Sequence, residues 1–363
     1  MFKKSVVLFA GGWVFLAVSG LCHGQSASPD WTDIAAADRD LMGNYIGTWY
    51  DPPDKSYQKI NPTLSAQVIN VDVGHYRVRF VQNLDRRAEV YFEGDANLKG
   101  ERIVYQGDEW SFTVGKDGLN GTGTIYGKTG PFKLERVALS SPTLGKEAPD
   151  GAIVLFDGSN FDAWEHQDGR AVTWTLLGDG AMEVPRRAAN DNGGPRIGGT
   201  IVSKQSFKDV RLHMEFRYPV EPGKKGQGRG NSGLFFQSGK GETVYEVQIL
   251  NSYGLEGYWN ECGALYRLIA PKVNAARPPL QWQTFDVEYR AARFDDEGNA
   301  QKNPRITVRL NGVLIHHEQE LFHRTQHREE ARFRGPPQDP GPIMLQDHSN
   351  RLQFRNIWVE ELD

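Results

Sequence analysis

A short stretch in the second half of the chain, Tyr245 to Leu250, places two polar side chains where they could act on a sugar. Its sequence, Tyr-Glu-Val-Gln-Ile-Leu, alternates like a β-strand, so Glu246 and Gln248 share one face. Neighbouring residues on one face lie about 7 Å apart, which suits a sugar ring. Glu246 is the leading candidate for a catalytic acid or base, and Gln248 for substrate binding. The alternative for Glu246 is a structural carboxylate that binds a loop backbone or Arg267.

Two further segments carry polar groups that could join this strand. The sequence Gly-Asn-Ser-Gly at residues 230–233 precedes it, and Gln-Asp-His at residues 346–348 lies far after it. His348 is the candidate for a catalytic base, with a structural turn histidine as the alternative. Asn231, like Gln248, suits recognition of sugar hydroxyl or carbonyl groups, although Asn231 could instead hold a turn. Gln346 is a further candidate for substrate binding.

Aromatic and basic side chains add to the candidate site. The irregular stretch at residues 251–279 contains Tyr258, Trp259, Tyr266 and Arg267, which can stack on a sugar ring or donate hydrogen bonds to it. We expect Tyr266 and Arg267 to bind substrate, together with Arg355 near the end of the chain. A structural ion pair is the alternative for each arginine.

Short alternating runs separated by glycine and aspartate recur through the chain, which predicts an all-β protein. Residues 25–139 have the rhythm of a small antiparallel β-meander domain, whose role the sequence does not indicate. Residues 140–150 form a polar segment without periodicity, interpreted as a linker. Residues 151–363 contain about a dozen predicted strands without intervening helices, which favours two packed antiparallel sheets.

The first residues predict export. Two lysines, a short apolar run and small residues before a polar stretch are typical of a signal peptide, here residues 1–24. The apolar run is shorter than the roughly 20 residues that a membrane span needs, so no integral span is expected after cleavage. The mature protein would be periplasmic or secreted, with lipoprotein anchoring through Cys22 as the lesser alternative.

Charge and residue spacing disfavour several classes of partner. The net charge is −4 and the basic residues are scattered, so nucleic acid is not an expected partner. His316, His317, His323 and His327 cluster in the sequence, but no predicted helix brings them to one face, so no metal site is expected. No cofactor is required, and a bound divalent cation such as calcium stays open as an alternative.

Seven short strings in the second half occur in the order typical of a known family. They include Leu-Phe-Asp-Gly from residue 155, the stretches around Asn231 and Glu246, Cys-Gly-Ala-Leu-Tyr from residue 262, and Phe-Arg-Asn-Ile-Trp from residue 354. With them, residues 151–363 resemble the 3-keto-disaccharide hydrolase family. The resemblance implies a concanavalin-like, jelly-roll sandwich and cleavage of an oxidised disaccharide or glycoside. It does not extend to the amino-terminal domain.

The residues of the predicted strand at 245–250 also bear on the catalytic mechanism. A retaining glucanase uses two carboxylates, but here Gln248 follows Glu246 and Leu250 stands where a second glutamate would be. A ketone at C3 removes that need, because it acidifies the hydrogen at C2 and allows β-elimination of the C1 oxygen. Hydrolysis and release of the enone remain alternative outcomes. The competing interpretations are a non-catalytic carbohydrate-binding module and an ordinary glucanase.

Overall fold

The computed structural model describes residues 35–49, 63–84, 87–185, 197–239, 242–325 and 329–363. The predicted signal peptide at residues 1–24, with Cys22, lies outside the described residues. Among the described residues, no helix has both the length and the apolar character needed to cross a membrane.

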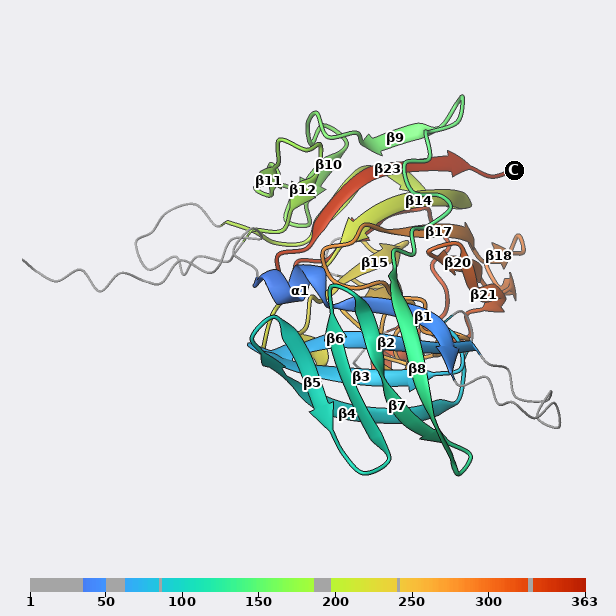
Figure 1. Cartoon of the computed structure of the whole chain (residues 1–363). Helices are drawn as coiled ribbons and strands as arrows, with labels where there is room; N and C mark the ends of the chain where they lie inside the picture. Colours follow the sequence, from blue (N-terminus) through green and yellow to red (C-terminus); the bar gives the residue numbers. More distant parts are fainter. Residues whose placement is uncertain (1–34, 50–62, 85–86, 186–196, 240–241, 326–328) are drawn as a thin grey trace, which may run out of the picture. The chain divides into compact units, whose positions relative to one another are not determined.

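The first half of the described chain is a closed β-barrel (Figure 1). After a short helix, α1 (Ala36–Asp40), eight antiparallel strands follow each other around the barrel in chain order: β1 (Gly43–Trp49), β2 (Thr63–Asp72), β3 (His75–Val81), β4 (Val90–Lys99), β5 (Arg102–Gln106), β6 (Trp110–Gly115), β7 (Gly118–Ile125) and β8 (Lys128–Val137). β8 closes the barrel by pairing with β1, from Asn44 opposite Val137 to Trp49 opposite Phe132. Alternate residues point inward, and apolar side chains such as Phe80, Trp110 and Phe112 fill the interior.

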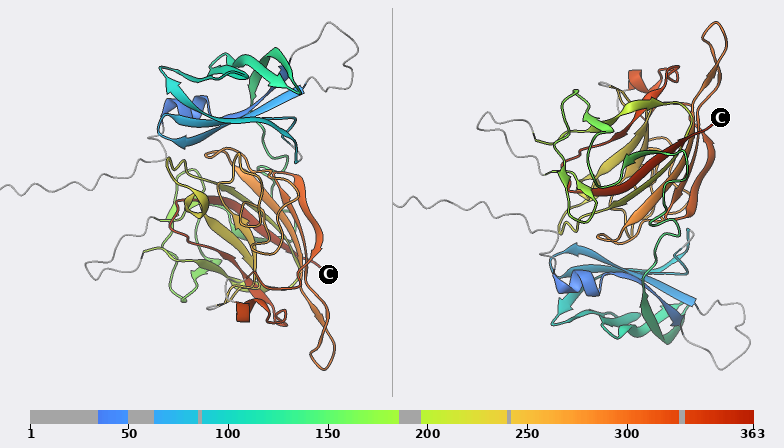
Figure 2. Two further views of the ribbon diagram at one scale, coloured as in Figure 1. Left: turned by 90° about the horizontal axis from the view of Figure 1, so that it is seen from below. Right: turned by 90° about the horizontal axis from the view of Figure 1, so that it is seen from above.

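The second half forms two antiparallel sheets, which Figure 2 shows from two further directions. The five-stranded sheet has the order β10 (Trp164–His166), β13 (Ile201–Phe207), β22 (Gly341–Leu345), β15 (Ser232–Phe236) and β16 (Tyr245–Ile249). The eight-stranded sheet has the order β11 (Thr175–Leu176), β12 (Met182–Glu183), β23 (Gln353–Glu361), β14 (Val210–Arg217), β17 (Gln283–Arg290), β20 (Arg305–Leu310) and β21 (Val313–Glu320), with β9 (Ile153–Phe156) also paired to β23. β18 (Arg293–Phe294) pairs with β19 (Ala300–Lys302), and two short helical turns, η2 (Gly226–Gly228) and α2 (Glu329–Arg332), lie in loops. The prediction of an all-β protein with an antiparallel sandwich is confirmed.

One apolar core fills the sandwich, and it includes residues of both sheets. On β14, Leu212, Met214 and Phe216 are fully buried in this core, and on β16 Val247 and Ile249 belong to the same cluster. Successive residues of a strand point to opposite faces. Every second residue of these strands therefore points away from the core, and this fixes where polar side chains can gather.

The segment predicted as a linker, residues 140–150, is bound along the outer face of the eight-stranded sheet. The Thr143 hydroxyl donates to the Asp286 carboxylate on β17 at 2.6 Å, and the Gly145 amide donates to the Glu215 carboxylate on β14 at 2.6 Å. Glu215 is fully buried beneath this segment. The segment has no helix or strand, but these hydrogen bonds fasten it to the sandwich.

Candidate active site

The candidate site lies on the outward face of the five-stranded sheet, at β15 and β16. On β16, Tyr245, Val247 and Ile249 pack into the main core, so Glu246 and Gln248 point away from it. The predicted alternation of this strand is therefore what the structure shows. β16 pairs with β15 on one side, and residues 263–266 run along its other side.

Glu246 is a buried carboxyl group without a polar partner. Its side chain is packed over Gly233 of β15, where an added Cβ would lie 2.7 Å from the Glu246 Oε1 atom. The residue is only 7% exposed, and within the described ranges its carboxyl group has no hydrogen bond or ion pair. Burial raises the pKa of Glu246 to about 8, because removal from water disfavours the charged form. Near pH 7 this residue is therefore mostly a neutral acid that can donate a proton.

Three amide side chains meet next to Glu246. The Gln248 amide donates to the Gln227 side-chain oxygen at 3.0 Å and to the Asn231 side-chain oxygen at 3.4 Å. Asn231 in turn donates to the Gln227 carbonyl at 2.8 Å. The Gln248 Oε1 atom is buried and has no partner among the described residues, which leaves an unsatisfied hydrogen-bond acceptor next to Glu246.

Gln227 is a residue that the sequence analysis missed. It belongs to the short turn η2, in a glycine-rich stretch without a periodic pattern, so only the folded loop shows that it joins Gln248 to Asn231. Also missed was a small apolar cluster of Val202, Phe235 and Met344, which is separate from the main core. Strand register places Phe235 opposite Glu246 and opposite Met344, so this cluster forms an apolar floor on the face that carries the polar groups.

Tyr266 and Arg267 lie beside the strand that carries Glu246. The Tyr266 amide donates to the Glu246 carbonyl at 3.1 Å. Burial, and after it the charge of Glu246, raises the pKa of the Tyr266 phenol. Arg267 follows with a positive φ of 61°, and its carbonyl accepts a hydrogen bond from Arg332 at 3.4 Å. The structure thus brings Tyr266 to Glu246 and places Arg267 next in the chain.

Gln346 and His348 come from the end of β22. The Gln346 amide donates to the Gly233 carbonyl at 3.0 Å, which puts Gln346 next to the glycine beneath Glu246. Asp347 fixes the following turn, because its carboxylate accepts from the Gly199 and Ser349 amides at 2.6 and 2.7 Å. His348 is exposed in this turn. The turn reaches the η2 loop through Asn350, which donates to the Gly228 carbonyl at 3.1 Å.

Arg355 does not belong to this site, which corrects the prediction from sequence. It lies on β23 of the eight-stranded sheet, next to the core residue Phe354, and points away from the core. Its guanidinium donates to the buried Glu215 carboxylate at 2.7 Å and lies 4.1 Å from the centre of the Trp282 ring. The structural ion pair considered as the alternative is what the structure shows. The alternating sequence predicts on which face of its strand Arg355 lies, but it does not predict which sheet that strand joins.

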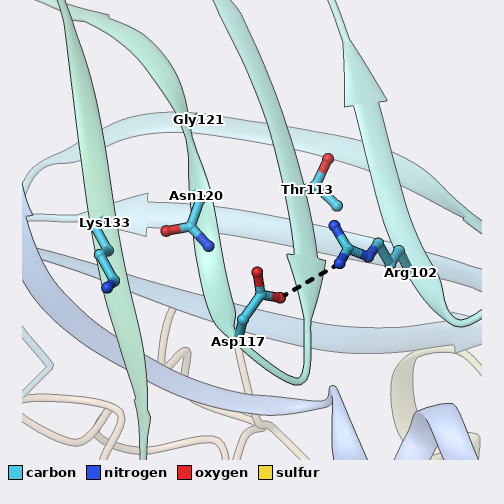
Figure 3. A pocket seen from close by; sticks show the side chains of 6 residues that line it. All are labelled: Arg102, Thr113, Asp117, Asn120, Gly121 and Lys133. Atoms are coloured by element: carbon cyan, nitrogen blue, oxygen red, sulfur yellow. Dashed lines mark ion pairs between the residues drawn. The ribbon is translucent and has the colours of Figure 1, made fainter.

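A polar pocket lies on the outside of the barrel (Figure 3). It is lined by Arg102, Thr113, Asp117, Asn120, Gly121 and Lys133. The nearest nitrogen of Arg102 and oxygen of Asp117 are 4.0 Å apart, and both side chains are more than half exposed. Such a solvated pair contributes little binding energy. The Glu246 face of the sandwich is the stronger candidate.

Comparison with known families identifies the part of the chain that contains this face. Residues 151–360 match the family described as 3-keto-alpha-glucoside-1,2-lyase-like domains. The chain belongs to this family. The match spans more than half of the chain and includes the whole Glu246 face, and it confirms the resemblance recognised from the sequence motifs.

The chain is also similar to solved structures. A candidate glycosyl hydrolase from Parabacteroides distasonis is 34% identical over 60% of this chain and 86% of its own, with a TM-score of 0.51. A second candidate glycosyl hydrolase from the same organism is 19% identical over 59% of this chain and 95% of its own, with a TM-score of 0.43. A Bacillus licheniformis beta-glucanase is 13% identical over 60% of this chain and all of its own, with a TM-score of 0.35. No curated protein matches the chain. Family membership and the first of these structures support an enzyme of glycosidase type that acts on carbohydrates.

Proposed function

We propose that this protein cleaves the glycosidic bond of 3-keto-glycosides, including 3-keto-disaccharides, by base-assisted β-elimination, with or without later hydration. The observation that carries the proposal is the single unpartnered carboxyl group of Glu246 on the outward face of β16. The family description, which names a 3-keto-alpha-glucoside-1,2-lyase, supports the same substrate class.

The composition of β16 argues against ordinary glycoside hydrolysis. A retaining glycosidase needs two carboxyl groups about 5 to 5.5 Å apart, one as nucleophile and one as acid. The strand offers Glu246 and then Gln248, whose amide cannot act as a nucleophile or an acid, and Leu250 follows at its end. A mechanism that needs only one protonated carboxyl group and a separate base fits these residues better.

In the proposed reaction, His348 removes the proton at C2, which the neighbouring C3 ketone acidifies. The electron pair of the C2–H bond forms an enolate, and its collapse breaks the bond from C1 to the glycosidic oxygen. Glu246 gives its proton to that oxygen, so the leaving group departs as a neutral alcohol. Both residues return to their starting states by exchanging protons with water. Addition of water across the C1–C2 double bond then gives net hydrolysis. If water is not added, the enone is released and the protein is a lyase.

The remaining residues position the oxidised sugar. The free Gln248 oxygen accepts from a ring hydroxyl, and Asn231 and Gln346 lie beside it for further hydrogen bonds. Tyr266 and Arg267 follow each other beside the strand of Glu246 and would make further contacts with the substrate.

The substrate class can be tested by incubating the purified protein with a 3-keto-glucoside, its unoxidised parent and an ordinary β-glucan. Cleavage of the keto compound alone is the expected result. Cleavage of the parent or of the glucan would contradict the requirement for the ketone. Binding without cleavage of any of the three would favour a carbohydrate-binding module instead.

We further propose that the protein is exported and loses residues 1–24, on the basis of the charged start and the apolar run that follows. After such cleavage Cys262, which is buried and free, would be the only cysteine. Expression of the full chain in bacteria, cell fractionation and amino-terminal sequencing test this. A mature protein in the periplasm or medium that begins near residue 25 is expected, and an uncleaved cytoplasmic chain would contradict export.

A further inference from the structure

One tryptophan near Glu246 is left exposed in a loop that is otherwise well packed. Trp259 is 49% exposed and its neighbour Tyr258 is 54% exposed, whereas Tyr253 and Tyr266 of the same stretch are buried. The reaction proposed above assigns no role to Trp259. A large aromatic surface that can be covered by a ring-shaped ligand contributes binding energy through burial and stacking.

The loop that carries Trp259 is held in place before any ligand binds. The buried Glu261 carboxylate accepts from the Gly257 and Tyr258 amides at 2.6 and 3.1 Å. Gln227, the residue that joins Gln248 to Asn231, also donates to the Asn260 carbonyl at 2.8 Å. Because the loop is already ordered, a ligand that stacks on Trp259 would lose little of its binding energy to ordering of the chain.

Trp259 is connected to Glu246 through a single residue. Its ring centre lies 6.0 Å from that of Tyr266, with an angle of 59° between the two planes. Its carbonyl accepts a hydrogen bond from the Arg267 amide at 3.1 Å, and the Tyr266 amide binds the Glu246 carbonyl at the same distance. Because the charge of Glu246 also acts on the Tyr266 phenol, Tyr266 links the exposed indole to the proposed acid.

The two parts of a bound substrate would lie on opposite sides of Glu246. Glu246 must reach the glycosidic oxygen, so the oxidised sugar lies to one side of it and the leaving group to the other. The amide groups of Gln248 and Asn231 provide hydrogen bonds for the ketone-bearing sugar. The Tyr266 and Trp259 side offers apolar ring faces, which stack on the flat faces of other rings.

We propose that Trp259, packed against Tyr266, forms a subsite that stacks on a ring in the leaving group. The preferred substrates would then carry a pyranose or aryl ring on the glycosidic oxygen rather than a small alkyl group. This inference rests on the proposed cleavage of 3-keto-glycosides and adds a residue that determines specificity for it.

The test compares methyl, phenyl and glucosyl 3-keto-glucosides as substrates of the unaltered protein and of Trp259→Ala. For each substrate, the variant is compared with the unaltered protein, so that differences in leaving-group reactivity cancel. We expect KM to rise about 3- to 10-fold for substrates with a ring in the leaving group, with kcat unchanged, because stacking contributes equally before and during the reaction. The methyl glycoside should be unaffected. Loss with only the phenyl or only the glucosyl compound would identify which ring the subsite takes.

Two further variants complete the experiment. Trp259→Phe should restore most of the affinity, and Tyr258→Ala, which removes an equally exposed aromatic ring from the same loop, should leave all three substrates unaffected. An equal loss for all three substrates with Trp259→Ala, no loss, or an equal effect of Tyr258→Ala would overturn the subsite. If the unaltered protein cleaves none of the three compounds, the proposed function itself fails, and the subsite fails with it.

Discussion

Glu246 is buried and has no polar partner in the part of the chain that the structure describes, which is costly for a carboxyl group. A buried carboxyl without hydrogen bonds or an ion pair destabilises its ionised form, and this raises its pKa to about 8. Shifts of this kind occur where a protein needs an acid that is still protonated at neutral pH. Substitutions of single residues therefore provide the most direct tests of the proposed chemistry.

Replacing the acid should remove one limb of the pH profile. With Glu246 as proton donor, kcat/KM for a 3-keto-glucoside should fall as the pH rises above about 8. Glu246→Gln should lower kcat about 100- to 10,000-fold and abolish this limb. Glu165→Gln, on the edge strand of the same sheet, is the matched control and should behave like the unaltered protein. An unchanged basic limb in Glu246→Gln would exclude Glu246 as the acid.

The same substitution should make the protein more stable. Folding raises the pKa of this carboxyl group, so burying it costs free energy at any pH where the unfolded chain would ionise it. This cost begins above pH 4.5 and is complete above about pH 8. Glu246→Gln should therefore raise the free energy of unfolding at pH 7 by on the order of 1 to 3 kcal/mol and have little effect at pH 4. Denaturant unfolding at both pH values measures this. A variant that is less stable at pH 7 would indicate a structural role for the carboxylate.

Gly233 supplies the space in which Glu246 lies. An added Cβ would be 2.5 Å from the Phe235 ring and 2.7 Å from the Glu246 carboxylate, which are both ends of side chains and can move. Gly233→Ala should therefore keep the fold but displace the acid, and a shift of about 1 Å can lower the rate about 100-fold. Gly178→Ala, where an added Cβ meets nothing within 4 Å, is the control. Equal activity of both variants would mean that Glu246 need not lie over Gly233.

At the scale of elements, alternation along single strands was readable from the sequence, but the partners of each strand were not. The pattern of residues 245–250 correctly placed Glu246 and Gln248 on one outward face, because side-chain alternation is a local property of a strand. Arg355 was misplaced because its pairing with Glu215 depends on which sheet β23 joins. Gln227 was missed because its contacts are made by a loop without any periodic signal.

The segment at residues 140–150 offers a test of how the outer face of the eight-stranded sheet is stabilised. Burial by itself would raise the pKa of Glu215, but the His213 ring 3.7 Å away and hydrogen bonds from Asn356, the Gly145 amide and Arg355 lower it to about 2. This carboxylate therefore stabilises the fold above pH 4.5, and its contribution is lost as the pH falls through about 2.

Glu215→Gln should lower the free energy of unfolding at pH 6 by on the order of 2 to 4 kcal/mol, because it also removes the carboxylate that pairs with Arg355 and faces His213. The difference from the unaltered protein should shrink as the pH is lowered toward 2. Glu288→Gln, at an exposed position of the same sheet, is the matched control and should change stability little. Equal stability of the Glu215 and Glu288 variants at pH 6 would contradict this role of Glu215.

At the scale of the whole molecule, the class of fold followed from the regular spacing of short alternating runs, and the family from seven motifs in order. Closure of the first eight strands into a barrel was not readable, because it depends on the pairing of β1 with β8, far apart in the chain. The lone glutamate on β16, on which the proposed chemistry rests, was readable, because the absence of a second carboxylate at Leu250 is visible in the sequence itself. The apolar floor beneath the site required both neighbouring strands and could not be inferred from either.

The central claim, elimination through an enolate, is tested most directly by the fate of the hydrogen at C2. The protein is incubated with a 3-keto-glucoside in deuterated water and the products are followed by NMR, with the authentic free keto-sugar in the same solvent as a control for spontaneous exchange. We predict either a free keto-sugar that carries deuterium at C2 from its first appearance or an enone that has lost the C2 hydrogen. A cleaved sugar that retains its original C2 hydrogen would show direct displacement at C1 and contradict the mechanism.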